Sequence, residues 1–257
     1  MSGPLREVAH LGYRYPGSAP DAPDAIADVS LTVMAGEFVA IVGPSGTGKT
    51  TLLRCIAGLA RPTSGEVRIA GIRVDGVPEH LAIVFQDYGR SLFPWLTVRD
   101  NVDLPLRHQR LPSEERTARV AAALGEVGLG DVGDRHPWQL SGGMQQRVAI
   151  ARAIAYQPQV LLMDEPFGSV DAQTRADLQD LVLAVWRAHG STVLFVTHDI
   201  DESVYLADRV VVLSPAPATL MAEVAVPVPR PRDQIETRSS AEFVNRRAEV
   251  ARLVRRP

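Results

Sequence analysis

Eight consecutive residues form the clearest chemical motif of the chain, the sequence GPSGTGKT from Gly43 to Thr50. It matches a phosphate-binding loop, in which glycines let backbone N–H groups point at phosphate oxygens and a helix N-terminus adds its dipole. Lys49 would bridge the β- and γ-phosphates, and the Thr50 hydroxyl would hold Mg²⁺. Lys49 is also the only lysine among 27 basic residues, which indicates a position that needs a compact ammonium group. An ordinary glycine-rich turn is the alternative.

Two acidic residues follow an apolar run from Val160 to Met163. Asp164 stands where a Mg²⁺ ligand is needed, directly or through water. Glu165 could polarise an attacking water molecule. Acids that only cap a following helix are the alternative, but the phosphate-binding loop elsewhere in the chain favours a catalytic role.

Two further positions could contact phosphate. His198 follows an apolar run, and a histidine at the carboxyl end of a sheet strand lies on the ligand-binding rim, unless it is purely structural. The sequence LSGGM from Leu140 to Met144 opens a helix that Ser141 can cap, and its glycines leave backbone N–H groups exposed. The chain thus has two candidate anion sites, unless the second is a plain helix cap.

These residues require alternating strands and helices to position them. Phe38–Val42 is a short, nearly all-apolar run, which is typical of a strand buried on both faces of a parallel sheet. Further strands are expected at 67–69, 81–85, 160–163, 192–196 and 209–213, and helices at 116–124, 144–155, 171–189 and 241–254. This alternation predicts a layered α/β core.

The two ends of the chain and its middle differ in character. Residues 5–35 are expected to be rich in strands, and the block from about 89 to 157 to be a helical insertion. The proline-rich stretch from Pro215 to Pro231 is expected to be a connector. Ser239 and Glu242 form a possible capping box for the last helix. The expected domains are residues 1–225, which include the insertion, and a C-terminal connector and helix at 226–257.

Composition limits the class of protein. The 257 residues are 46% hydrophobic and 22% charged, which excludes a disordered or fibrous chain, and the net charge of −3 argues against a strongly basic nucleic-acid surface. The single cysteine, Cys55, excludes a disulfide framework and is expected to be a packed apolar residue. No apolar run approaches the roughly 18 residues of a membrane span, so any work at a membrane would need another chain to span it.

Taken in order, the motifs resemble those of the ATP-binding-cassette (ABC) ATPases, most closely the ATPase subunits of bacterial nitrate, sulfonate and taurine importers. The resemblance covers nearly the whole chain. Residues 43–51 resemble the Walker A motif, and residues 140–147 resemble the signature helix. Asp164 resembles the acid of Walker B, and Glu165 resembles the catalytic glutamate. Gln86 matches the Q-loop glutamine, residues 169–171 the D-loop, and His198 the switch histidine. Residues 86–102, 171–175 and 197–202 are similar to the importer group.

The resemblance implies a P-loop NTPase fold with an N-terminal antiparallel β subdomain and a helical insertion. It implies ATP and Mg²⁺ as cofactors and two copies bound head to tail, so that the second anion site completes the partner's ATP site. Catalytic roles would fall to Lys49, Gln86, Glu165 and His198, and Mg²⁺ binding to Thr50, Gln86 and Asp164. The implied nucleotide-binding residues are Tyr15, Gly43, Pro44, Ser45, Gly46, Thr47, Gly48, Lys49, Thr50, Thr51, Ser141, Gly142, Gly143 and Asp171.

Tyr15 and Met144 depart from a simple match. Tyr15 sits where the family places an aromatic ring on adenine, but the loop after it looks long, so Tyr13 is a rival, and a packed strand aromatic is the alternative for either. Met144 replaces the usual glutamine of the signature. Little loss is expected, because Ser141 and the glycine N–H groups would make the phosphate contacts.

The resemblance also implies partners: a membrane permease near Gln86, a solute-binding protein, no nucleic acid, and a location on the cytoplasmic face of the cell membrane. It leaves the transported solute open. Phe93 and Trp95 are either core residues or permease contacts. The arginine-rich C-terminal tail either binds lipid or a partner, or forms a helix packed through Phe243, Val250 and Leu253.

Two other functions are weighed against a transport ATPase. The first is an ABC ATPase that acts on DNA or ribosomes, but such proteins usually carry two cassettes or long coiled coils, and this chain has neither. The second is a P-loop kinase or GTPase. The guanine-reading motif Asn-Lys-x-Asp needs a second lysine, which the chain lacks, and neither enzyme explains the signature helix.

Overall fold

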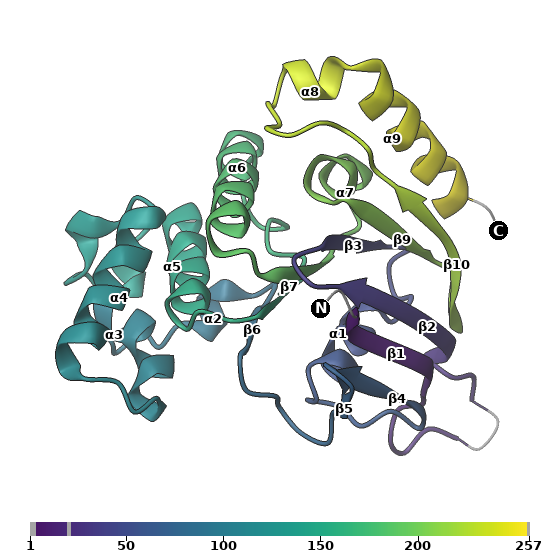
Figure 1. The fold of residues 1–257 in the computed structure, drawn as a ribbon, viewed down its shortest axis with the longest axis horizontal. Coiled ribbons are helices and arrows are strands. Elements are labelled where there is room, and N and C mark those ends of the chain that lie inside the picture. Colours follow the sequence, from purple (N-terminus) through teal and green to yellow (C-terminus); the bar gives the residue numbers. More distant parts are fainter. Residues whose placement is uncertain (1–3, 20–21, 256–257) are drawn as a thin grey trace. The chain divides into compact units, whose positions relative to one another are not determined.

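The computed structural model describes residues 4–19 and 22–255, which divide into two compact units (Figure 1). The first unit contains the chain up to Leu81 and again from Ser191, and the second contains Ala82–Gly190.

A mixed sheet forms the first unit, with the strand order β5-β4-β1-β2-β10-β9-β3-β8. β1 is antiparallel to β2 and β4, whereas β3 is parallel to β8 and β9, so the predicted antiparallel subdomain and parallel core are both present. Its strands are β1 (Pro4–Tyr13), β2 (Ile26–Met34), β3 (Phe38–Val42), β4 (Ser64–Ile69), β5 (Ile72–Arg73), β8 (Thr192–Val196), β9 (Arg209–Leu213) and β10 (Ala218–Ala225).

The hydrophobic pattern explains these strands. Every residue of β3 and β8 is buried, as expected for strands covered on both faces. In β2, Val29, Leu31 and Val33 are buried while Ser30 and Thr32 are exposed, the alternation expected of a strand with one face against the core.

The described residues of the first unit form the helices α1 (Lys49–Ile56), α7 (Ile200–Leu206), α8 (Glu236–Ser239) and α9 (Ala241–Val254). α1 buries Leu52, Leu53 and Ile56. α9 packs on α7, β9 and β10, with Phe243 and Val250 buried (Figure 1). The packed-helix interpretation of the C-terminal tail is therefore confirmed for these two residues, and Leu253 is half-buried.

The second unit is mainly helical and contains two hydrogen-bonded strands, β6 (Leu81–Val84, which begins at the end of the first unit) and β7 (Val160–Asp164). α6 was predicted over residues 171–189; it begins one residue later, after the capping residue Asp171, and ends before Gly190, which has a left-handed backbone. The helices are α2 (Tyr88–Ser91), α3 (Val98–Asp103), α4 (Ser113–Glu126), α5 (Gly142–Ala155) and α6 (Ala172–His189), with short 3₁₀ helices η1 (Leu104–His108), η2 (Gly130–Val132) and η3 (Pro137–Gln139).

Two predictions near the C-terminus are wrong. The expected connector contains β10, because a proline-free stretch inside it pairs with β9, with Leu220 opposite Leu213 and Val224 opposite Val210. The cap of α9 is Ser240, whose hydroxyl accepts from the Phe243 N–H, whereas the Ser239 hydroxyl donates to a carbonyl of the preceding turn.

Among the residues that the structure describes, no helix has the length and apolarity needed to cross a membrane.

Candidate functional site

The predicted phosphate-binding loop connects β3 to α1 and has the backbone that such a loop needs. Gly46 and Gly48 have φ values of 76° and 100°, a left-handed conformation that favours glycine. The Lys49 side chain is buried, and its Nζ donates to the carbonyls of Gly43 and Pro44 at 2.9 Å each. The Thr47 hydroxyl donates to the Pro44 carbonyl at 2.6 Å. The ammonium group is thus held against the loop that would receive the phosphates.

His198 lies at the same sheet edge as this loop. β3 and β8 are parallel neighbours, with Ile41 opposite Val196, and the loop and His198 follow their carboxyl ends. The His198 side chain is exposed. The two predicted phosphate contacts of the first unit, the loop and His198, therefore follow two adjacent strands.

Tyr15 is more exposed than Tyr13, its rival. The Tyr15 side chain is 53% exposed, and its hydroxyl lies 2.7 Å from Thr51 Oγ1, next to the start of α1. Tyr13 is half-buried at the end of β1, and its ring meets that of Tyr15 edge-on at 5.3 Å. The exposed ring beside the phosphate-binding loop is that of Tyr15, and Tyr13 supports it.

In the second unit, Asp164 is the last residue of β7 and Glu165 follows it. Asp164 is buried, while Glu165 has a φ of 43°, a left-handed conformation that is strained for a residue with a side chain. Such strain is often found at functional positions. Gln86 Nε2 donates to Glu165 Oε2 at 3.4 Å, so the structure brings these two predicted catalytic residues together.

The signature helix, α5, and the D-loop before α6 are close together at Thr174, a residue that was not predicted from the sequence. A Cβ built on Gly143 would lie 2.5 Å from Cγ2 of Thr174 on α6. The Thr174 hydroxyl donates to the Asp171 carboxylate at 2.6 Å, which lowers the pKa of Asp171. The Ser141 hydroxyl accepts from the Met144 N–H at 3.3 Å, as predicted for a cap. The Asp-x-x-Thr spacing of a helix cap was the available signal for Thr174.

Phe93 and Trp95 lie on a loop that is hydrogen-bonded to a buried asparagine. Their exposed fractions are 37% and 70%, so the core interpretation is wrong for Trp95. Asn101 is fully buried and holds the loop: its Nδ2 donates to the carbonyls of Phe93, Leu96 and Thr97, and its Oδ1 accepts from the Phe93 N–H at 2.8 Å.

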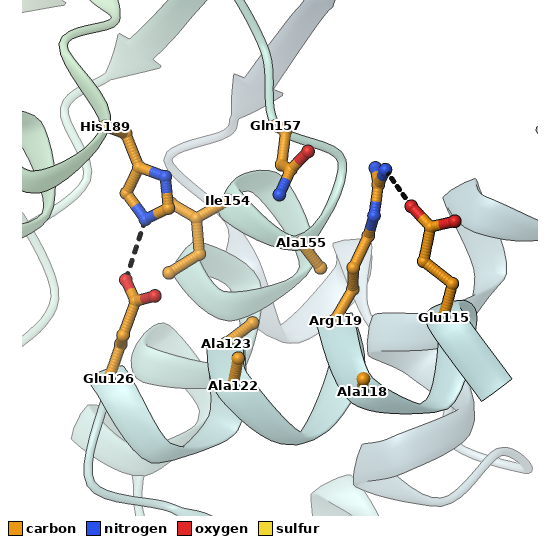
Figure 2. A pocket seen from close by; sticks show the side chains of 10 residues that line it. All are labelled: Glu115, Ala118, Arg119, Ala122, Ala123, Glu126, Ile154, Ala155, Gln157 and His189. Atoms are coloured by element: carbon orange, nitrogen blue, oxygen red, sulfur yellow. Dashed lines mark hydrogen bonds and ion pairs between the residues drawn. The ribbon is translucent and has the colours of Figure 1, made fainter.

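A separate pocket of about 350 Å³ lies within the second unit (Figure 2). Its floor is formed largely by alanine methyl groups, and its rim carries an ion pair between Glu115 and Arg119 and a hydrogen bond between Glu126 and His189. None of its lining residues is a predicted site residue, and these polar rim groups already contact each other.

The order and local geometry of these motifs agree with a match to a known family. The family model described as ABC transporter matches residues 26–168, more than half of the chain. The chain belongs to the ABC transporter family. This membership confirms the resemblance drawn from the motifs and makes the chain an ABC ATPase.

Relatives of this ABC ATPase are similar over most of their length. It is 48% identical over 220 residues to the taurine import ATP-binding protein TauB of Chromobacterium violaceum, covering 86% of this chain and 82% of that protein. It is 42% identical over 236 residues to the nitrate import ATP-binding protein NrtD of Synechocystis, covering 90% and 88%. These names favour a transport ATPase over an ABC ATPase that acts on DNA or ribosomes.

Solved structures confirm the fold of the ABC ATPase. The structure of cbiO1 from Clostridium perfringens, part of an ABC transporter complex, has a TM-score of 0.77 at 28% identity and covers 87% of this chain and 89% of that one. A dimeric ATP-binding cassette, MJ0796, in a post-hydrolysis state with ADP and Pi, has a TM-score of 0.74 at 33% identity and covers 86% and 99%.

Proposed function

We propose that this ABC ATPase powers the import of a small solute of the nitrate, sulfonate or taurine class through a separate permease, on the cytoplasmic face of the cell membrane. The observation that carries the proposal is the phosphate-binding loop with the buried Lys49 amine held against it. The importer class is supported by relatives named as taurine and nitrate import ATP-binding proteins. A solute-binding protein would deliver the solute to the permease.

The proposed mechanism begins with neutralisation of the phosphates. Lys49 and the free backbone N–H groups of the phosphate-binding loop bind the β- and γ-phosphates, and Tyr15 stacks on the adenine. Glu165 orients or deprotonates the attacking water, and His198 holds the γ-phosphate end. Gln86, hydrogen-bonded to Glu165, senses the permease and connects it to hydrolysis.

The donor set suits Mg²⁺. The residues proposed to hold it are Thr50, Gln86 and Asp164, and each offers an oxygen, the ligand atom that this hard cation prefers. When bound, Mg²⁺ would neutralise charge on the phosphate oxygens.

Two copies are proposed to bind head to tail. Ser141, Gly142 and Gly143 of one copy then contact the ATP held by the P-loop of the other, and Asp171 lies beside them in the D-loop. The dimeric state of the solved cassette MJ0796 supports this arrangement. ATP joins the copies and hydrolysis releases them, which shifts the permease between two states.

The first experiment is affinity purification of the tagged chain from membranes under gentle conditions, followed by mass spectrometry. We expect a permease with several membrane spans to co-purify. Recovery of ribosomes or DNA-bound proteins, with no membrane protein, would contradict the transport proposal but not the assignment as an ATPase.

The second experiment tests the chemistry. Glu165→Gln is expected to bind ATP and lose hydrolysis, and Lys49→Ala to lose ATP binding, both measured on the purified chain. Glu114→Gln, on the exposed first turn of α4, is the matched control for loss of a carboxylate. Hydrolysis by Glu165→Gln at the wild-type rate would show that the role given to Glu165 is wrong.

A further inference from the structure

Two arginines of the C-terminal segment bind all four carbonyl groups that the end of α7 leaves without a helical partner. The last turn of a helix cannot satisfy these carbonyls itself. Arg232 donates to the carbonyls of Val204, Tyr205 and Ala207 at 3.2, 2.6 and 3.0 Å. Arg230 donates to the remaining one, that of Leu206, at 2.8 Å. The two guanidinium groups together form the cap of α7.

The charge of Arg232 suits this position. Burial lowers the pKa of its guanidinium to about 10, so it stays charged at neutral pH. A positive charge at the carboxyl end of a helix is favourable, because the exposed carbonyls carry partial negative charge. Arg230 also pairs with Asp208 at 2.8 Å, which holds its guanidinium in place. A neutral side chain at position 232 would leave several carbonyls without these donors.

Other contacts hold α7 against the same segment. The Arg238 guanidinium lies 4.8 Å above the Tyr205 ring, and Arg247 of α9 pairs with Asp201 at 3.5 Å. α9 packs alongside α7 (Figure 1), and its Phe243 side chain is buried. The C-terminal segment therefore contacts α7 along its length.

The opposite end of α7 is tied to the residues on either side of His198. Asp199 caps the helix by accepting from the Glu202 N–H at 3.1 Å. The Thr197 hydroxyl donates to the Glu202 carboxylate at 2.7 Å and accepts from the Asp199 N–H at 2.9 Å. Because both neighbours of His198 belong to this network, a shift of α7 moves the His198 backbone.

We propose that Arg232, together with Arg230, is a positioning residue for ATP hydrolysis: it fixes α7 and thereby holds His198 where its side chain meets the γ-phosphate. The proposal rests on the role given to His198 in the proposed function. ATP affinity depends mainly on the P-loop, which α7 does not carry. Loss of the cap should therefore lower kcat and leave KM for ATP nearly unchanged.

The test uses the purified full-length chain with ATP and Mg²⁺. Arg232→Met keeps the apolar length of the side chain and removes every donor. We expect kcat to fall about tenfold or more, since misplacement of a catalytic group by about 1 Å has such effects, with KM within about twofold. In the His198→Ala chain, Arg232→Met should lower kcat no further. Arg252→Gln, an exposed arginine of α9, is the matched control and should leave kcat unchanged.

The outcomes separate the two proposals. If Arg232→Met lowers kcat by the same factor with and without His198, or changes only KM, the positioning role is wrong. If His198→Ala alone keeps the wild-type kcat, the role of His198 in the proposed function fails instead. Should Arg232→Met not fold, as judged by circular dichroism, Arg230→Gln removes the guanidinium bonds to Leu206 and Asp208. It must show the same dependence on His198, or the inference is overturned.

Discussion

At the scale of single residues, the Cγ2 methyl group of Thr174 leaves no room for a side chain at Gly143 of the signature helix. A Gly143→Ala side chain would meet Cγ2 of Thr174 at 2.5 Å, and overpacking of this kind typically costs about 1–3 kcal/mol. We expect Gly143→Ala to lower both the melting temperature and the ATPase rate, although it keeps the backbone N–H that would contact phosphate. Adding Thr174→Ser removes the methyl group and keeps the hydroxyl bound to Asp171, so the double variant should recover both properties.

The control for this pair is Gly130→Ala, whose added methyl group would meet nothing within 4 Å and whose φ is not positive. It should melt like the wild type. A double variant as impaired as Gly143→Ala alone would mean that the defect comes from the nucleotide contact and not from packing.

Cys55 allows a second test at this scale, because it is the only thiol of the chain. It is buried in α1, and burial raises its pKa to about 11. Since the thiolate is the reactive form, iodoacetamide at pH 8 should label the native chain far more slowly than the chain unfolded in guanidinium, as measured by mass spectrometry. Equal rates would contradict the packed position.

The same shift predicts a pH dependence of stability. The unfolded thiol ionises near 9.0 and the native one near 11, so between these values the unfolded chain binds fewer protons. This contribution to stability is therefore present below pH 9 and lost as pH rises toward 11. The stability of wild type relative to Cys55→Ala, measured by denaturant unfolding, should fall across this window.

At the scale of elements, Asn101 is the residue that shapes the loop with the exposed aromatic rings. Its side chain makes four hydrogen bonds to that loop from a fully buried position. Asn101→Ala would leave buried backbone groups unpaired, at a cost of about 1–3 kcal/mol for a group of this kind. If Phe93 and Trp95 contact the permease, the variant should lose permease co-purification while its basal ATPase rate stays near wild type.

Asn245→Ala, an exposed asparagine of α9, is the matched control. Permease recovery at the wild-type level from Asn101→Ala would show that the ordered loop is not needed for docking.

Elements with a strong local pattern were predictable from the sequence. The all-apolar run of β3 and the capped, periodic α6 match their predicted positions closely. β10 was not predicted, because prolines on both sides suggested a connector and its pairing with β9 depends on tertiary contact. The cap of α9 differs by one residue, since two adjacent serines offer the same hydroxyl.

The residues of the candidate site also differ in how well the sequence predicts them. Residues within motifs, such as Lys49 and Glu165, were predictable because their chemistry depends on local spacing. Thr174 and Arg232 were missed, because they act on neighbours that the fold supplies. The Arg232 partners at the end of α7 lie more than 20 positions away in the sequence, and no local pattern connects them.

At the scale of the whole molecule, the proposed head-to-tail dimer builds each ATP site from two chains. The P-loop and His198 belong to one compact unit, and the signature helix and D-loop belong to the other. In a head-to-tail dimer, a P-loop variant and a signature variant damage the same site when they are combined, and the other site stays intact. A site built within one chain would be damaged in every subunit of the mixture.

Mixing Lys49→Ala with Ser141→Ala distinguishes these cases, with Glu165→Gln in both chains so that bound ATP persists. We expect mixed dimers to occlude about half as much radiolabelled ATP as dimers with only Glu165→Gln, and either variant alone to occlude little, because the P-loop and the signature both contact phosphate. Dimers are separated by size-exclusion chromatography before counting. Mixed dimers that occlude no more ATP than the separate variants would contradict head-to-tail sharing. If the sites are shared, one ATP site of each mixed dimer keeps both an unchanged P-loop and an unchanged signature.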